Sequence, residues 1–144
     1  MIDDWVFVDT NILVYAYDVT AEKKHKTAAE IITGLWETGK GIISTQVLQE
    51  FYVTVVQKIP NPIDEEKAAG IIRDMLNWKL IVNDGFIILE AINIQKRYQL
   101  SFWDSLILEA AISGGANVLL SEGLSHQQII ENVQIKNPFL DKSH

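Results

Sequence analysis

The sequence predicts an α/β fold, a three-layer α/β/α sandwich around a central and mainly parallel sheet. Short runs of β-forming apolar residues alternate with longer segments whose apolar residues recur every three to four positions. The short runs carry no polar alternation, which is typical of strands covered on both faces. Strands that alternate with helices form parallel sheets with helices on both sides. The length of 144 residues suits one domain, which we expect to span residues 1–144.

The first strand is expected at residues 5–8 and ends abruptly at Asp9. Residues 12–17 then show the apolar spacing of a short helix, so Asp9 lies between a buried strand and a helix. Ligands of open α/β sheets bind at the carboxyl ends of the strands, which makes this carboxylate a candidate for chemistry. Asp9 or Thr10 can equally cap the following helix. The residues alone leave both roles open.

The next three elements are a helix, a strand and a second helix. The helix at residues 21–38 has an apolar side and is followed by two glycines. The strand at residues 41–43 leads to Ser44 or Thr45, either of which can cap a helix over residues 46–58. The apolar positions of that helix recur with a period of 3.6 residues, which predicts one buried side.

Two prolines at positions 60 and 62 then break the chain. The helix expected at residues 64–77 opens with three acidic residues, which the helix dipole favours in the first turn. A third strand is expected at residues 79–82. Asp84 follows it as the cap of a helix that extends to Tyr98.

The helix expected at residues 102–113 is apolar nearly all round, which predicts a central, buried position. Gly114 and Gly115 end it. A fourth strand follows at residues 118–120, and a last strand at residues 133–135. Between these two strands we expect a short helix over residues 127–131.

Composition and charge narrow the class of protein. The sequence has no cysteine, which excludes disulfides and thiolate metal sites and agrees with a reducing cytoplasm, where we expect the protein. The acidic start is unlike a signal peptide, and no apolar run approaches the ~20 residues that span a bilayer, so no membrane association is expected. The formal charge of −7 opposes broad phosphate binding, so a nucleic-acid partner would require local positive patches or bound cations. The basic runs at residues 23–26 and 96–97 are read as solvated helix ends, with phosphate contact as the alternative.

Three further carboxylates, Glu50, Asp104 and Glu122, are candidates for a functional role. Glu50 lies opposite the apolar side of its helix, which by itself indicates a solvated surface residue. Asp104 lies in the first turn of the most apolar helix, where it fits a capping box with Ser101 and can also act as a ligand. Glu122 follows the fourth strand.

Asp9, Asp104 and Glu122 can converge at one edge of the sheet. Carboxylates gathered there would repel one another unless a cation lay among them. Oxygen ligands without cysteine fit Mg²⁺ or Mn²⁺. Such a cluster is typical of metal-assisted phosphoryl chemistry, and the ion would offset the negative field that repels nucleic acid.

Four segments in order resemble the four motifs of PIN-domain ribonucleases, the fold of VapC-type toxins. The segments are residues 6–11 (VFVDTN), 44–51 (STQVLQEF), 101–104 (SFWD) and 119–122 (LLSE). Each motif is weak alone, but the ordered combination spans almost the whole chain. The resemblance implies a PIN-like fold and a single-strand-specific or structure-specific ribonuclease that uses Mg²⁺ or Mn²⁺.

The resemblance also implies which residues form the site. The matching positions are the metal-binding acids Asp9, Glu50 and Asp104 and the site-orienting polar residues Thr10 or Asn11 and Ser121. The resemblance replaces the surface interpretation of Glu50, because that side of the helix faces the acidic cleft in this family. It further implies a homodimer, and an antitoxin partner encoded beside the many small members that are toxins.

The sequence departs from the family at one position. The family usually carries a fourth acid two residues after the Ser or Thr that ends the fourth strand, and Gly123 stands there. Glu122 is adjacent, but neighbouring residues at a strand end point in different directions. The loss of one ligand would weaken a second metal site more than a first.

Two functions from different classes follow. The first is a metal-dependent endoribonuclease, which as a family member can be the toxin of a toxin–antitoxin pair. In this function Asp9 and Asp104 hold the principal ion, Glu50 holds or orients the attacking water, and Glu122 assists. Its products would carry a 5′-phosphate and a 3′-hydroxyl. The alternative is a weak or inactive PIN-like domain that binds RNA or a protein, which Gly123 and the acidic charge favour. Phosphotransfer is a third reading, but the haloacid-dehalogenase pattern requires a second aspartate where Asn11 stands.

Overall fold

The computed structural model of the chain describes residues 3–140 and contains a six-stranded sheet. The strand order is β3-β2-β1-β4-β6-β5, and every pairing is parallel except the last, between β6 and β5. The strands are β1 (Val6–Val8), β2 (Gly41–Ser44), β3 (Lys79–Ile81), β4 (Val118–Leu120), β5 (Ile129–Ile130) and β6 (Val133–Lys136). The expected central and mainly parallel sheet is confirmed.

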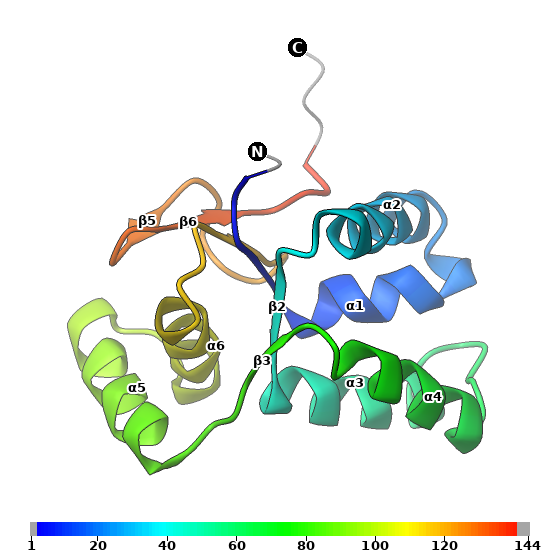
Figure 1. Cartoon of the computed structure of the whole chain (residues 1–144), viewed down its shortest axis with the longest axis horizontal. Coiled ribbons are helices and arrows are strands. Elements are labelled where there is room, and N and C mark those ends of the chain that lie inside the picture. The colour runs from blue at the N-terminus through cyan, green and yellow to red at the C-terminus, as the bar shows by residue number, and fades with distance from the viewer. Residues whose placement is uncertain (1–2, 141–144) are drawn as a thin grey trace.

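Six α-helices and one short 3₁₀ helix connect these strands within residues 3–140. They are α1 (Thr10–Tyr17), the 3₁₀ helix η1 (Val19–Ala21), α2 (Lys23–Thr38), α3 (Thr45–Gln57), α4 (Glu65–Met75), α5 (Gly85–Tyr98) and α6 (Phe102–Ser113). Figure 1 shows α5 and α6 on one side of the sheet and α1 to α4 on the other. This arrangement is the expected three-layer sandwich, in which each parallel connection carries a helix over one face of the sheet.

The prediction of a short helix over residues 127–131 is wrong. Ile129 and Ile130 form β5, which pairs antiparallel with β6. Glu131 and Asn132 connect the two strands, with φ angles of 50° and 71°. Two consecutive residues with positive φ form the type of turn that joins two-residue hairpins, because its twist matches that of the strands. Ile130 is buried, so the hairpin also contributes to the core.

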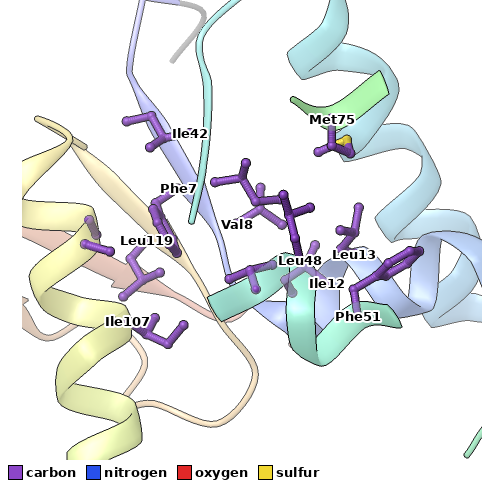
Figure 2. Close-up of a cluster of buried hydrophobic side chains, with 14 of the residues drawn as sticks. Phe7, Val8, Ile12, Leu13, Ile42, Leu48, Phe51, Met75, Ile107 and Leu119 are labelled. Atoms are coloured by element: carbon purple, nitrogen blue, oxygen red, sulfur yellow. The ribbon is translucent and has the colours of Figure 1, made fainter. Parts of the chain in front are cut away.

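The hydrophobic core lies between the sheet and the helices α1, α3 and α6. Phe7 of β1 and Phe51 of α3 are completely buried. The labelled side chains that meet in Figure 2 are Phe7, Val8, Ile12, Leu13, Ile42, Leu48, Phe51, Met75, Ile107 and Leu119. Each fully buried side chain of this size contributes about 1.5–3 kcal/mol to stability. This packing fixes β1, α1, α3 and α6 relative to one another.

The register of the central strands places their carboxyl ends at one edge of the sheet. Val8 at the end of β1 pairs with Leu120 at the end of β4. The amide of Asp9 donates to the carbonyl of Leu120 at 3.0 Å, so the pairing continues one residue past β1. Asp9 and Ser121 therefore leave the sheet side by side. No helix in residues 3–140 has both the length and the hydropathy needed to cross a membrane.

Candidate active site

Asp9 joins the end of β1 to the start of α1. It is the N-cap of α1, and its Oδ1 accepts a hydrogen bond from the amide of Thr10 at 2.7 Å. Its other oxygen, Oδ2, accepts from the hydroxyl of Ser121 at 2.7 Å. The capping role considered from the sequence is confirmed. It coexists with a position at the ligand-binding edge of the sheet.

Ser121 fixes the orientation of the Asp9 carboxylate from the neighbouring strand. Its side chain is fully buried directly after β4, and its amide donates to the carbonyl of Lys136 in β6 at 3.0 Å. Besides donating to Asp9, its hydroxyl oxygen accepts from the amide of Gly123 at 3.2 Å. The hydroxyl thus connects Asp9 to the segment that follows β4.

Glu50 is exposed on α3, as the helical periodicity predicts, and yet it faces α1. Its Oε1 accepts a hydrogen bond from the hydroxyl of Thr10 at 2.6 Å. Thr10 thereby contacts two acids, Asp9 through its amide and Glu50 through its side chain. Exposure and membership of the site are compatible because the site lies at the surface edge of the sheet.

Gln46 is a site residue that sequence reasoning missed. Its side chain is buried on α3, and its Nε2 donates to Oε2 of Glu50 at 3.3 Å and to the carbonyl of Trp103 at 3.4 Å. It therefore links α3 to the first turn of α6, immediately before Asp104. The available signal was spacing: residues four apart lie on the same side of a helix, so Gln46 had to neighbour Glu50.

Asp104 lies in the first turn of α6 and is partly buried. Its amide donates to the hydroxyl of Ser101 at 3.0 Å, so the predicted cap by Ser101 is confirmed. The positive end of the helix dipole favours an ionised carboxylate at this position. The next residues of the helix, from Ser105 to Ala111, are buried, which holds its first turn in place.

Glu50 and Asp104 lie close enough to Asp9 for their charges to affect its pKa. Burial raises the pKa of Asp9 to about 6, and the hydrogen bonds from Ser121 and Thr10 oppose this rise. The negative charges of Glu50 and Asp104 raise the pKa of Asp9 further. A positive charge close to Asp9 would reverse these effects and stabilise its ionised form.

Within residues 3–140, two buried oxygen atoms beside these acids have no hydrogen-bond partner. They are Oδ1 of Asn11, which follows Thr10 in α1, and Oε1 of Gln46. Buried polar atoms in proteins are almost always paired with protein groups, water or ions. Either acceptor can bind a water or a cation beside the acids.

Glu122 is engaged elsewhere. Its Oε1 accepts from the hydroxyl of Tyr15 at 2.7 Å, and its Oε2 forms an ion pair with Lys24. Burial alone would raise the pKa of Glu122, but the hydrogen bonds from Lys24 and Tyr15 and the charge of Lys24 together lower it. The acids whose charges act on Asp9 are Glu50 and Asp104. The sequence analysis did not identify Tyr15 or Lys24 as partners of Glu122.

The donor set of the site fits a hard divalent cation, but the acids are not gathered around one point. Asp9, Glu50 and Asp104 offer only carboxylate oxygens, the ligands that Mg²⁺ and Mn²⁺ prefer. In residues 3–140, however, no three acidic or histidine side chains are grouped as they would be to hold an ion. The oxygens of Asp9 and Glu50 are instead engaged by Ser121, Thr10 and Gln46. The chemistry of the residues fits the metal, whereas their arrangement is not a preformed cage.

Comparisons with known proteins agree with this architecture. A model of the PIN domain family matches residues 6–129. The fold is similar to that of VapC20 from Mycobacterium tuberculosis, described as a toxin that cleaves the sarcin–ricin loop. That match has a TM-score of 0.62 and 19% sequence identity, and it covers 79% of this chain and 86% of the other. No curated protein sequence matches this chain. Because the family model covers most of its length, the chain belongs to the PIN domain family.

Proposed function

We propose that this protein is a metal-dependent endoribonuclease. The observation that carries the proposal is the position of Asp9 at the carboxyl end of β1, where its burial and, to a smaller extent, the charges of Glu50 and Asp104 raise its pKa to about 6. Three elements distant in sequence thus direct acids to one edge of the sheet. Strongly perturbed carboxylates in such a place are typical of functional sites.

Asp9, Glu50 and Asp104 would hold the metal, which we propose to be Mg²⁺ or Mn²⁺. A bound ion of this kind supplies an activated water and a Lewis acid for a phosphate oxygen. The mutual repulsion of the three acids would be relieved by the ion, so ion binding and the gathering of the acids would be coupled. PIN-domain nucleases generally use divalent ions, which supports this assignment.

The other residues of the site would position Asp9 and activate the attacking water. Ser121 and the amide of Thr10 hold the Asp9 carboxylate. Glu50 would orient the attacking water and accept its proton. In the reaction, the water oxygen bonds to phosphorus, the bond from phosphorus to the 3′-oxygen breaks, and a proton reaches that oxygen. The products are a 5′-phosphate and a 3′-hydroxyl.

Glu122 would assist indirectly. Through Tyr15 and Lys24 it ties the segment after β4 to α1 and α2. That segment includes Ser121, which positions Asp9. Asn11, with its unpartnered Oδ1, would orient water or substrate beside Thr10.

RNA is the proposed substrate, and VapC20, described as a toxin that cleaves the sarcin–ricin loop, supports this proposal. By the same analogy we propose a toxin with an antitoxin protein as partner, a homodimer, and a location in the cytoplasm. The absence of cysteine is compatible with a reducing compartment.

A second function has two observations in its favour. Residues 3–140 contain no preformed three-ligand cluster, and Gly123 occupies the position where the family usually has a fourth acid. Both features fit a catalytically weak or inactive domain that binds RNA or a protein. Cleavage assays separate the two functions directly.

The test is Mn²⁺-dependent cleavage of a mixed RNA pool by the purified protein. We expect cleavage by the natural sequence and none with EDTA or with Asp9→Asn. Asp74→Asn is the matched control, because it makes the same change on the exposed surface of α4. Cleavage that persists in Asp9→Asn would reject the assigned site. A folded protein that binds RNA without cleaving it would favour the binding function.

A further inference from the structure

A cavity of about 450 Å³ extends the acidic site along α3. It is lined by Thr10, Gln49, Glu50, Val53, Thr54 and Lys58. Thr10 and Glu50 belong to the site described above, whereas Lys58 is the last residue of this series and the C-cap of α3. Residues 50, 54 and 58 are spaced by one helical turn each, so they form one continuous side of the helix. At 1.5 Å per residue, about 12 Å of helix axis separates Glu50 from Lys58.

Lys58 carries the only positive charge among the residues that line this cavity. Its side chain is exposed, and within residues 3–140 no hydrogen bond or ion pair engages its ammonium group. By contrast, Lys24 is committed to Glu122, and Arg97 to Glu131. The charge of Lys58 is therefore available to a ligand.

The other lining residues suit a nucleic-acid strand. Gln49 and Thr54 present hydrogen-bond donors that can contact phosphate oxygens, and Val53 is 40% exposed and offers an apolar surface to a sugar or base. The protein as a whole carries a formal charge of −7, so a polyanion that reaches the acids must be compensated locally. A lysine beyond the acids, with neutral donors between, provides that compensation.

We propose that the cavity along α3 is a subsite for single-stranded RNA in which Lys58 binds a phosphate other than the one that is cleaved. This inference rests on the proposed ribonuclease function. Glu50 marks the end of the cavity where the chemistry takes place, and Lys58 marks the end that holds the neighbouring part of the strand. Lys58 is a positioning residue for substrate and contacts no reacting atom.

The test compares Lys58→Gln, Lys58→Arg and the control Lys67→Gln. Lys67 is exposed at the start of α4, outside the lining of the cavity, and its replacement removes the same charge. Binding of a fluorescent single-stranded RNA is measured in EDTA over a range of salt concentrations, and cleavage is measured with Mn²⁺.

We expect Lys58→Gln to lower the slope of log affinity against log salt by about 0.7, the value for one lost phosphate contact of a single strand. Its KM should rise severalfold with kcat unchanged, since the contact is the same in the ground state and the transition state. Lys58→Arg should restore both values, and Lys67→Gln should match the natural sequence.

The outcomes separate this inference from the proposed function. If the natural sequence cleaves RNA and Lys58→Gln behaves like Lys67→Gln, the subsite is wrong and the nuclease stands. If the natural sequence binds RNA with a slope that depends on Lys58 but does not cleave, the subsite stands and the nuclease is wrong. Failure of the natural sequence both to bind and to cleave RNA overturns both.

Discussion

Asp9 and Glu122 are two carboxylates that follow neighbouring parallel strands, and their environments are opposite. Asp9 follows β1, is held by neutral donors and has Glu50 and Asp104 as charged neighbours, and its pKa is raised to about 6. Glu122 lies just past β4 and is paired with Lys24, and its pKa is lowered. Burial disfavours the charge in both cases.

The difference is that, within residues 3–140, Glu122 has a positively charged partner in the protein and Asp9 does not. Glu122 has its counter-charge within the protein, so an added cation gains little from it. Asp9 has no cation among its partners, and its neighbours add negative charge. An external cation would therefore be most stabilised beside Asp9. We therefore expect a structural role for Glu122 and a ligand-binding role for Asp9.

The largest expected effect is the loss of RNA cleavage on replacing Asp9, compared with the loss on replacing Glu122. We expect Asp9→Asn to lower Mn²⁺-dependent cleavage by at least about 10³-fold, since members of a catalytic unit cannot be removed singly without near-complete loss. Glu122→Gln should lose about 10- to 100-fold, the range for residues that act on a metal site through its ligands. Initial cleavage rates on one RNA measure both. An equal loss in the two variants would show that Glu122 is itself a ligand.

The next effect concerns stability without metal. Asp9 has a pKa of about 6 in the folded protein and about 3.8 as a free side chain, so its neutral form stabilises the fold. That contribution is complete below about pH 4 and is lost as the pH rises through 6, which amounts to about 3 kcal/mol of unfolding free energy.

Urea unfolding in EDTA between pH 4 and pH 8 measures this dependence. We expect Asp9→Asn to be as stable as the natural sequence near pH 4 and more stable near pH 8, since asparagine does not ionise. Mn²⁺ should then stabilise the natural sequence at pH 8 and leave Asp9→Asn unchanged. A stability difference that is the same at every pH would contradict the burial of the Asp9 charge.

A smaller effect is expected from Ser121→Ala. This change removes the hydroxyl that donates to Asp9 and accepts from the amide of Gly123. Leaving buried partners unpaired costs about 1–3 kcal/mol of stability. The acidic limb of the pH–rate profile should move to higher pH, because the hydrogen bond from Ser121 lowers the pKa of Asp9. An unshifted limb would mean that Asp9 does not control the profile.

The smallest effect concerns the missing acid. A Cβ added at Gly123 would meet no atom within 4 Å, so the position has room for a side chain to begin. We expect Gly123→Asp to lower the Mn²⁺ concentration for half-maximal cleavage severalfold, and Gly123→Asn, which has the same size and no charge, to leave it unchanged. Equal behaviour of the two variants would show that this position does not face the metal.

Much of the fold was determined by local sequence. The apolar runs and their periods predict five of the six strands and each of the α-helices within residues 3–140. The caps Ser44, Asp84 and Ser101 accept the expected hydrogen bonds from amides three residues on, and Asp9 accepts from the adjacent amide of Thr10. These features depend on residues within one or two turns of each other, which is why sequence patterns find them.

The hairpin of β5 and β6 escaped this reasoning. Its turn places Glu131 at a positive φ, which glutamate rarely adopts, so no typical turn signal marked it. What stabilises the turn is the pairing of the strands on either side and the burial of Ile130. These contributions come from tertiary packing and override the local preference of the residue.

The site shows the same division. The sequence by itself supplied the acids at strand and helix ends, and the family pattern supplied their grouping. Only the tertiary structure placed Thr10 against Glu50, 40 positions away, and Lys24 against Glu122, 98 positions away. Helical periodicity tells which residues leave the apolar side of α3, but it does not tell which element faces them. Burial and charge environment are sums over contacts from the whole chain, and so the opposite pKa shifts of Asp9 and Glu122 were decided by the fold.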